Sequence, residues 1–273
     1  MYQLELARSV PFGLLDEEYV KGLKEAGILN IEFGICAVKI DDDPAQTKAV
    51  FEEKVALLKR FGIGIPSVHL PFGPTWELCV PDDVIRERAM KRYLELIDLC
   101  KLIAPKRFIL HPGYPRVPQE ERQERIENFR RNVKVLAAAA APAKIAVENM
   151  PQDCLGNTAR ELLSLVEGMD ELCLCCDMNH YYQETTYDAI RLLGKRIETI
   201  HVNDFDGVKE KHWLPGDGIL DWNRILGELE KLDYHGPFLY ECIQDHNSFT
   251  VAENKKMLFE NYHVRRSDDH EET

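Results

Sequence analysis

The chain has 273 residues, 45% of them hydrophobic, which is enough to bury one large α/β core or two smaller ones. Its 34 Lys and Arg residues against 47 Asp and Glu residues leave a formal net charge of −13. A protein that wraps nucleic acid needs clustered Lys and Arg to neutralise phosphates, so this charge balance argues against a nucleic-acid partner. A small neutral or weakly charged substrate fits it better.

The eight cysteines lie mostly inside apolar runs. We identify no secretory signal at the N-terminus and no apolar stretch of membrane length, so we expect reduced thiols, a cytoplasmic location and no membrane partner. Cys173, Cys175 and Cys176 form a cluster, but its C-x-C-C spacing matches no zinc or redox motif. Because neighbouring residues of a strand point to opposite faces, we expect these cysteines to be packing residues.

Short apolar runs bounded by turn residues predict strands that recur along the whole chain. Glu32 interrupts the second of these runs, and an acidic loop at residues 41–43 follows it. In chain order, the predicted strands lie within residues 1–10, 28–35, 65–70, 108–110, 145–147, 172–176, 197–202 and 238–240.

Each predicted strand is followed by a segment with helical spacing of its apolar residues. Gly27 and Gly62 stand just past the first two such segments, where a helix commonly stops. In chain order, the predicted helices cover residues 16–26, 44–61, 82–103, 118–141, 158–167, 186–193, 221–232 and 251–262.

Strands alternating with helices eight times, at this length, predict a single (β/α)8 TIM barrel. We expect residues 1–264 to form the barrel and residues 265–273 to be a flexible charged tail. An open doubly wound sheet is the competing α/β fold. It often carries a Gly-rich first turn, and no G-x-G-x-x-G sequence follows the first predicted strand.

A side chain able to bind a metal ion ends each of the last six predicted strands. In chain order, these side chains are His69, His111, Glu148, Asp177, His201 and Glu241. One such residue alone would be explained as a satisfied core histidine or a helix-capping acid. The active site of a TIM barrel forms at the C-terminal ends of its strands, where these side chains would meet. Converging carboxylates are costly without a cation, so the pattern predicts a metal site there.

Two further histidines follow these strand ends in loops. His180 comes three residues after Asp177, so both could reach one centre if the chain turns; a helix cap, which Asn179 could also supply, is the alternative. His212 precedes a Pro-Gly-Asp-Gly segment (residues 215–218), which predicts a tight turn. Taken alone, that segment would be only a loop with a surface histidine.

At these residues the chain resembles the xylose isomerase-like TIM-barrel superfamily. The superfamily includes sugar isomerases, sugar epimerases and the family-two apurinic/apyrimidinic endonucleases. The resemblance runs from Ser67 to Glu241, and the order of its motifs is its most specific feature. In chain order, the motifs are S-V-H-L-P (67–71), L-H-P-G (110–113), A-V-E-N (146–149), C-D-M-N-H (176–180), I-H-V-N-D (200–204), L-P-G-D-G (214–218) and Y-E (240–241).

In the sugar isomerase and epimerase branch, the resemblance implies one divalent metal, most often Mn²⁺, with Zn²⁺, Mg²⁺ or Co²⁺ as alternatives. Its ligands would be Glu148, Asp177, His201 and Glu241, and the two glutamates would also act as acid and base. A metal that bridges a carbonyl and a neighbouring hydroxyl stabilises the enediolate formed by proton removal.

The same branch implies a sugar pocket around the metal. His180 would hold a substrate oxygen. The remaining pocket candidates from this branch are His69, His111, Phe72 and Trp76. Lys211, with Lys209, could bind a phosphate of the substrate, and a pair of solvated loop lysines is the alternative.

The endonuclease branch uses a fuller ligand set that binds three zinc ions. The corresponding positions here are His69, His111, Glu148, Asp177, His180, His201, Glu210, His212 and Glu241. One departure is Glu210, where the family has an aspartate, one methylene shorter. A second departure concerns the epimerases, many of which have an arginine at the position of His212.

We therefore favour a metal-dependent isomerase or epimerase of a sugar or sugar phosphate. A lyase or dehydratase with the same site, an endonuclease-like phosphodiesterase and a metal-binding barrel without turnover are the alternatives. Loop acidity at residues 41–43 and at Glu77, Asp82 and Asp83 counts against DNA, since few cations, among them Arg116 and Lys209, lie near the expected mouth. The expected partner is a small carbohydrate. Related barrels often form homo-oligomers, and the sequence leaves the oligomeric state open.

Overall fold

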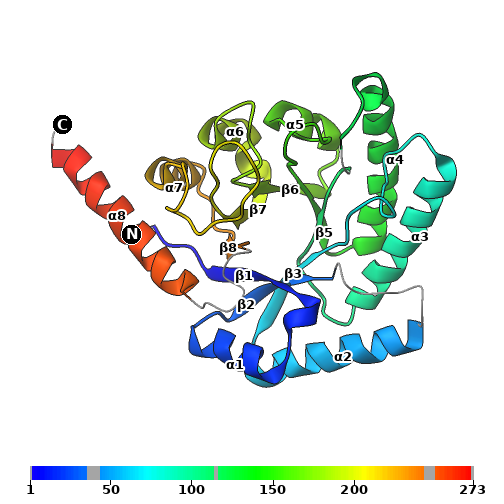
Figure 1. The fold of residues 1–273 in the computed structure, drawn as a ribbon, viewed down its shortest axis with the longest axis horizontal. Coiled ribbons are helices and arrows are strands. Elements are labelled where there is room, and N and C mark those ends of the chain that lie inside the picture. Colours follow the sequence, from blue (N-terminus) through cyan, green and yellow to red (C-terminus); the bar gives the residue numbers. More distant parts are fainter. Residues whose placement is uncertain (1, 36–43, 114–115, 243–249, 272–273) are drawn as a thin grey trace.

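The strands close into one barrel in which each is parallel to its neighbours, β1 pairing with both β2 and β8 (Figure 1). This computed structural model describes residues 2–35, 44–113, 116–242 and 250–271, and it confirms the predicted single (β/α)8 barrel. The strands are β1 Leu6–Pro11, β2 Asn30–Gly34, β3 Gly64–His69, β4 Arg107–Leu110, β5 Lys144–Glu148, β6 Leu172–Asp177, β7 Ile197–Val202 and β8 Phe238–Tyr240.

Helices connect successive strands and cover the outside of the barrel (Figure 1). Within the described part of the chain, none of them is both long and apolar enough to cross a membrane. Their bounds are α1 Glu17–Glu25, α2 Pro44–Phe61, α3 Asp83–Cys100, α4 Arg122–Ala140, α5 Ala159–Val166, α6 Thr186–Leu193, α7 Trp222–Lys231 and α8 Val251–Glu271.

Side-chain caps explain why several helices begin one residue later than predicted. Asp82 accepts hydrogen bonds from the backbone N–H groups of Val84 and Ile85, and Asp221 accepts one from that of Arg224. Each aspartate therefore stands just before the helix and satisfies N–H groups that lack a partner within it.

The last helix is longer than the sequence predicts. α8 includes residues 265–271 of the charged segment and extends away from the barrel (Figure 1). Whether this segment is flexible stays a prediction. Cys36 and the acidic loop at residues 41–43 lie outside the described residues.

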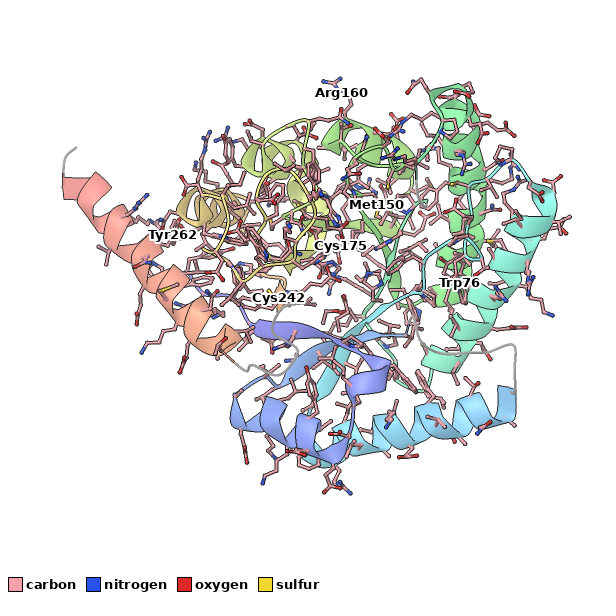
Figure 2. The ribbon with its side chains drawn as sticks, in the orientation of Figure 1. Trp76, Met150, Arg160, Cys175, Cys242 and Tyr262 are labelled. Atoms are coloured by element: carbon pink, nitrogen blue, oxygen red, sulfur yellow. The ribbon has the colours of Figure 1, made fainter. Side chains whose placement is uncertain are left out.

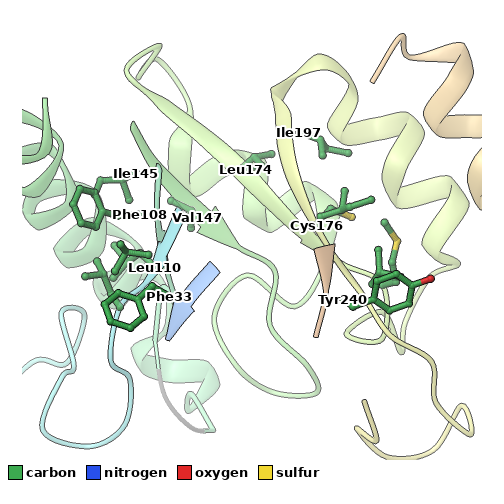
Figure 3. Close-up of a cluster of buried hydrophobic side chains, with 14 of the residues drawn as sticks. Phe33, Phe108, Leu110, Ile145, Val147, Leu174, Cys176, Ile197 and Tyr240 are labelled. Carbon is green, nitrogen blue, oxygen red and sulfur yellow. The ribbon is translucent and has the colours of Figure 1, made fainter. Parts of the chain in front are cut away.

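Alternation along the strands divides the apolar side chains into two sets. The larger set lies between the strands and the helices, and Figure 3 shows part of it around Phe108, Val147 and Cys176. The smaller set is Ile109, Ala146, Cys173 and Cys175, which alternate with members of the larger set and therefore face the barrel interior. Residues two positions further along these strands face inward as well, and this places the strand-end polar side chains at the mouth.

A buried carboxylate links the helices that follow the strands of Asp177 and His201. Glu228 of α7 accepts hydrogen bonds from Arg191 Nε at 2.8 Å and Nη2 at 2.7 Å, and from Lys231 Nζ at 2.9 Å. The hydrogen bonds from Arg191, with the charge of Lys231, lower the pKa of Glu228 to about 2 despite its burial.

We expect Glu228→Gln to lower the free energy of unfolding at pH 7 by about 1–2 kcal/mol, because charged hydrogen bonds are lost. The folded-state pKa is below the unfolded value of about 4.3. The carboxylate therefore contributes fully above that unfolded value, and its contribution is lost as the pH falls toward 2. Urea denaturation at pH 7 and pH 3 measures this, with the difference between wild type and variant shrinking at pH 3. The exposed Glu260→Gln is the control, and an equal difference at both pH values would contradict the prediction.

Candidate metal centre

The six predicted strand-end side chains come together at the C-terminal mouth of the barrel. His69, Glu148 and Asp177 are the last residues of their strands, and His201 lies one residue before the end of β7. Glu148, Asp177 and His201 are at most 1% exposed. The mouth is therefore a buried polar site, and its side chains fall into three groups.

The first group surrounds one ring nitrogen of His201. Nδ1 lies 3.1 Å from Glu148 Oε1, 3.1 Å from Glu241 Oε2 and 3.7 Å from Asp177 Oδ2. The candidate ligand atoms of these residues all lie within 4.8 Å of one another. Bonds of about 2.0–2.2 Å to a single divalent cation would fit this spacing.

The second group shares Glu148 with the first. Glu148 Oε2 lies 3.3 Å from His69 Nε2 and 3.2 Å from His111 Nε2. The ring of Phe72 stacks on that of His111 with centroids 4.4 Å apart, and Phe72 is 44% exposed. Oε1 of Glu148 thus belongs to the first group and Oε2 to the second. The exposed ring of Phe72 lies beside the second group.

The third group is formed by His180, Glu210 and His212. Glu210 Oε1 lies 3.4 Å from His180 Nε2 and 2.8 Å from His212 Nε2. The extra methylene of Glu210, relative to the family's aspartate, therefore does not prevent its carboxylate from reaching between the two rings.

Backbone carbonyls fix how these histidines face the carboxylates. His69 Nδ1 lies 2.9 Å from the carbonyl of Leu70, and His180 Nδ1 lies 2.8 Å from that of Asn149. A carbonyl only accepts, so Nδ1 carries the proton and Nε2 keeps its lone pair in the neutral ring. In each case Nε2 points toward a carboxylate oxygen, which is also an acceptor. Two acceptors repel each other, and a proton or a metal cation between Nε2 and the carboxylate oxygen would remove that repulsion.

Several side-chain atoms of the mouth lack hydrogen bonds. Within the described residues, Glu148 Oε2, His180 Nε2 and His111 Nδ1 are among the atoms buried without a hydrogen-bond partner. Buried polar atoms are seldom left in this state. Carboxylate oxygens and imidazole nitrogens in these positions fit a divalent cation as their partner.

The charges of the mouth shift several pKa values in opposite directions. Burial raises the pKa of Glu148, but His201 and His111 outweigh it and hold this pKa well below its usual range. Burial raises the pKa of Asp177 to about 6. For His180, burial lowers the pKa, but Asp177 and Glu210 raise it to about 10. The crowded acids thus favour any cation among them, whether an imidazolium or a metal.

Comparison with known proteins places the chain in a family. A family model described as xylose isomerase-like TIM barrel matches residues 20–261. The chain belongs to this family. L-Ribulose-5-phosphate 3-epimerase UlaE of Escherichia coli is 22% identical over 280 residues, which cover 92% of this chain and 93% of that enzyme.

Solved structures share the fold over nearly the whole chain. A D-tagatose 3-epimerase-like protein superposes with a TM-score of 0.77 at 20% identity, covering 97% of this chain and 99% of its own. A Thermus thermophilus protein whose crystals were soaked with ZnCl2 superposes with a TM-score of 0.72 at 23% identity, covering 93% and 98%. At these identities the likeness shows the fold.

Some residues of the site were not among the sequence-based candidates. Asn149 brackets the backbone of Asp177: its Nδ2 donates to the carbonyl at 3.0 Å and its Oδ1 accepts from the N–H at 2.7 Å. Asn203 Nδ2 donates to Asp177 Oδ2 at 2.9 Å. Glu32 of β2 contacts His201. Their only signals in the sequence were their places within strand-end motifs and, for Glu32, a charge inside an apolar run.

The pocket candidates lie at different distances from the groups. Trp76 packs against Tyr93 of α3, with ring centroids 5.0 Å apart, and Figure 2 shows it beside that helix. Lys211 Nζ lies 3.7 Å from Asp206 Oδ2 and over the ring of Trp213. The pocket roles of Trp76 and Lys211 stay predictions, while Phe72 contacts the second group directly.

The cysteine cluster divides as strand alternation requires. Cys176 packs in the outer core, whereas Cys175 faces the barrel interior. A ligand atom of Cys175 lies within 4.8 Å of those of Glu148 and His201. Burial raises the pKa of Cys175 well above its usual range, so it remains a thiol beneath the first group.

Asp204 holds together the loop that carries Glu210 and His212. Its Oδ2 accepts from the N–H of Gly216 and from Trp222 Nε1, both at 2.9 Å. Its Oδ1 accepts from the N–H groups of Phe205, at 2.9 Å, and Leu220, at 3.2 Å. Donors on both sides of the Pro-Gly-Asp-Gly turn, and Gly216 within it, therefore converge on one buried carboxylate.

The base of this loop is closed by backbone pairing. Asp204 and Trp213 exchange two backbone hydrogen bonds of 2.8 Å. His212, beside the bridge, has a φ of 51°, a conformation that residues other than glycine seldom adopt. A side chain at position 218 would collide with the carboxylate of Asp204, so this position requires glycine. The position of His212 is therefore fixed by the bridge between Asp204 and Trp213 and by the close packing at Gly218.

We expect Asp204→Asn to lower the free energy of unfolding by about 1–3 kcal/mol, since an amide cannot accept all the bonds that the carboxylate accepts. Hydrogen exchange at residues 205–220 should accelerate. Asp206→Asn is the matched control, because Asp206 is partly exposed and accepts backbone bonds from Val208 and Lys209 on the same loop. Equal exchange rates in the two variants would contradict a special role for Asp204.

Proposed function

We propose that this chain is a divalent-metal-dependent isomerase or epimerase of a sugar or sugar phosphate, with Mn²⁺ as the preferred metal. The observation that carries the proposal is that Glu148 and Glu241 reach the same nitrogen of His201 from β5 and β8. Two carboxylates on one centre can serve as ligands and as an acid–base pair. The similarity to L-ribulose-5-phosphate 3-epimerase, and to a structure described as D-tagatose 3-epimerase-like, supports a carbohydrate substrate.

The two glutamates differ in their exposure to solvent. The side chain of Glu241 is 21% exposed, whereas that of Glu148 is 1% exposed. His201 opposes the effect of burial and holds the pKa of both carboxyls below the usual range, so both are ionised and able to take a proton. A divalent cation held by Glu148, Asp177, His201 and Glu241 would polarise the carbonyl and adjacent hydroxyl of the substrate and so stabilise the enediolate.

Proton transfer then needs only the glutamates. One carboxylate removes the proton from the carbon beside the carbonyl. The other glutamate, after taking up a proton from solvent, returns it to the opposite face of that carbon or to its neighbour. The first result is epimerisation and the second is isomerisation. Phe72, exposed beside the mouth, offers an apolar surface for the face of a sugar.

A multi-zinc phosphodiesterase is the second candidate, and the assembly of all nine family ligand positions favours it. The loop acids that counted against DNA are also partly engaged within the fold. Glu77 Oε2 lies 3.3 Å from Arg125 Nη1, Asp82 caps α3, and Asp83 pairs with Arg86. The net charge of −13 still opposes binding to a polyanion. A lyase that uses the same enediolate is a variant of the first proposal.

We expect Glu148→Gln and Glu241→Gln each to lower the rate of solvent deuterium incorporation into substrate by about 10²–10⁴-fold, since each removes a proton-transferring group. The assay follows Mn²⁺-loaded protein in deuterated water with ketohexoses and ketopentose 5-phosphates, by NMR. Glu228→Gln, remote from the mouth, should exchange at the wild-type rate. Unchanged exchange in either site variant would refute its role, and no exchange by the wild type with any ketose would refute the isomerase assignment.

Metal content separates the two candidates. Elemental analysis of the purified protein should give one divalent ion per chain for the isomerase and two or three Zn²⁺ for the phosphodiesterase. Glu210→Gln should leave the metal count at one in the first case and reduce it in the second. Nicking of abasic duplex DNA with added Zn²⁺ or Mn²⁺ would overturn the isomerase proposal.

A further inference from the structure

Glu32 is a fully buried carboxylate on β2, within a run of apolar residues. Its neighbours Ile31 and Phe33 pack in the outer core, so the side chain of Glu32 points the other way, into the barrel. Oε1 lies 2.9 Å from His201 Nε2, and Oε2 accepts a hydrogen bond of 2.9 Å from Ser67 Oγ. A buried polar group is costly without hydrogen-bond partners, and the partners of Glu32 are His201 and Ser67.

The contact crosses the barrel interior. β2 and β7 are not neighbours, because β8 and β1 lie between them in the closed sheet. Backbone pairing therefore does not place His201 against Glu32; their side chains meet only because both point inward. Ser67 on the adjacent strand β3 is in register with Glu32 and fixes the second carboxylate oxygen.

The contact decides which nitrogen of His201 is available to a metal. A carboxyl oxygen accepts hydrogen bonds, so an N–H at Nε2 is placed to donate to Glu32 Oε1 across the 2.9 Å contact. In the neutral ring the lone pair is then on Nδ1, the nitrogen that faces Glu148, Asp177 and Glu241. Carboxylate partners of this kind orient metal-binding histidines and increase their basicity.

We propose that Glu32 is a positioning residue, which holds His201 in the Nε2–H tautomer and thereby sets the affinity of the metal centre. This inference rests on the proposed function, since it needs a divalent ion at the first group. Glu32 acts through one imidazole, with Ser67 holding its second oxygen.

The test measures Mn²⁺ affinity by calorimetry and the state of the His201 ring by ¹⁵N NMR of the Zn²⁺-loaded protein. Glu32→Gln keeps the shape but presents either a donor or an acceptor to Nε2. We expect it to weaken Mn²⁺ binding by about 10–100-fold and to shift or split the Nε2–H signal of His201. Ser67→Ala keeps the carboxylate, so we expect a smaller loss of affinity with the Nε2–H signal retained.

Glu228→Gln is the matched control, a buried glutamate replaced outside the mouth, and we expect it to leave both readouts at wild-type values. An affinity of Glu32→Gln within twofold of wild type, or an unaltered His201 signal, would overturn the inference. If Glu32→Gln does not fold, loss of the Nε2–H signal in Ser67→Ala would overturn it instead, and retention with weaker binding would support it. Failure of the wild type to bind any divalent ion would refute the proposed function and this inference with it, whereas wild-type binding with an unchanged affinity in Glu32→Gln would refute the inference alone.

Discussion

His201 is contacted by carboxylates at both of its ring nitrogens, and the mouth of the barrel is arranged around that constraint. Glu32 faces one nitrogen, while Glu148 and Glu241 face the other. These acids come from β2, β5 and β8, so only a closed barrel brings them to a single imidazole. Each acid would be costly in isolation, and together they provide a site that favours a cation.

Much of this could be predicted from the sequence, because strand periodicity is local. The apolar runs gave all the strands and, through the residue at each strand end, the members of the first group. Contacts across the barrel could not be predicted, because they depend on which residues face inward in a sheet whose register was unknown. Glu32 was visible as a charge in an apolar run, but its partner lies 169 residues away.

Other differences have equally physical causes. The Pro-Gly-Asp-Gly segment was correctly read as a turn, but the sequence does not show that Gly216 within it and Leu220 after it donate their N–H groups to Asp204. The family resemblance implied a pocket role for Trp76, which stays a prediction; the structure adds its packing against Tyr93 of α3. Loop acids were counted as free charges, although Asp82 and Glu77 are satisfied by a helix terminus and by Arg125.

The bridge between Asp204 and Trp213 divides the loop after β7 into a base, closed by backbone hydrogen bonds, and an exposed remainder. Its closed base holds His212 beside the carbonyl of Glu241, whereas Val208 and Ile219 of the loop stay solvent-exposed. Loop closure depends only weakly on length, so changes at exposed positions such as Val208 would leave the base in place. Under the proposed function, such changes would alter the rim of the mouth and not the position of His212.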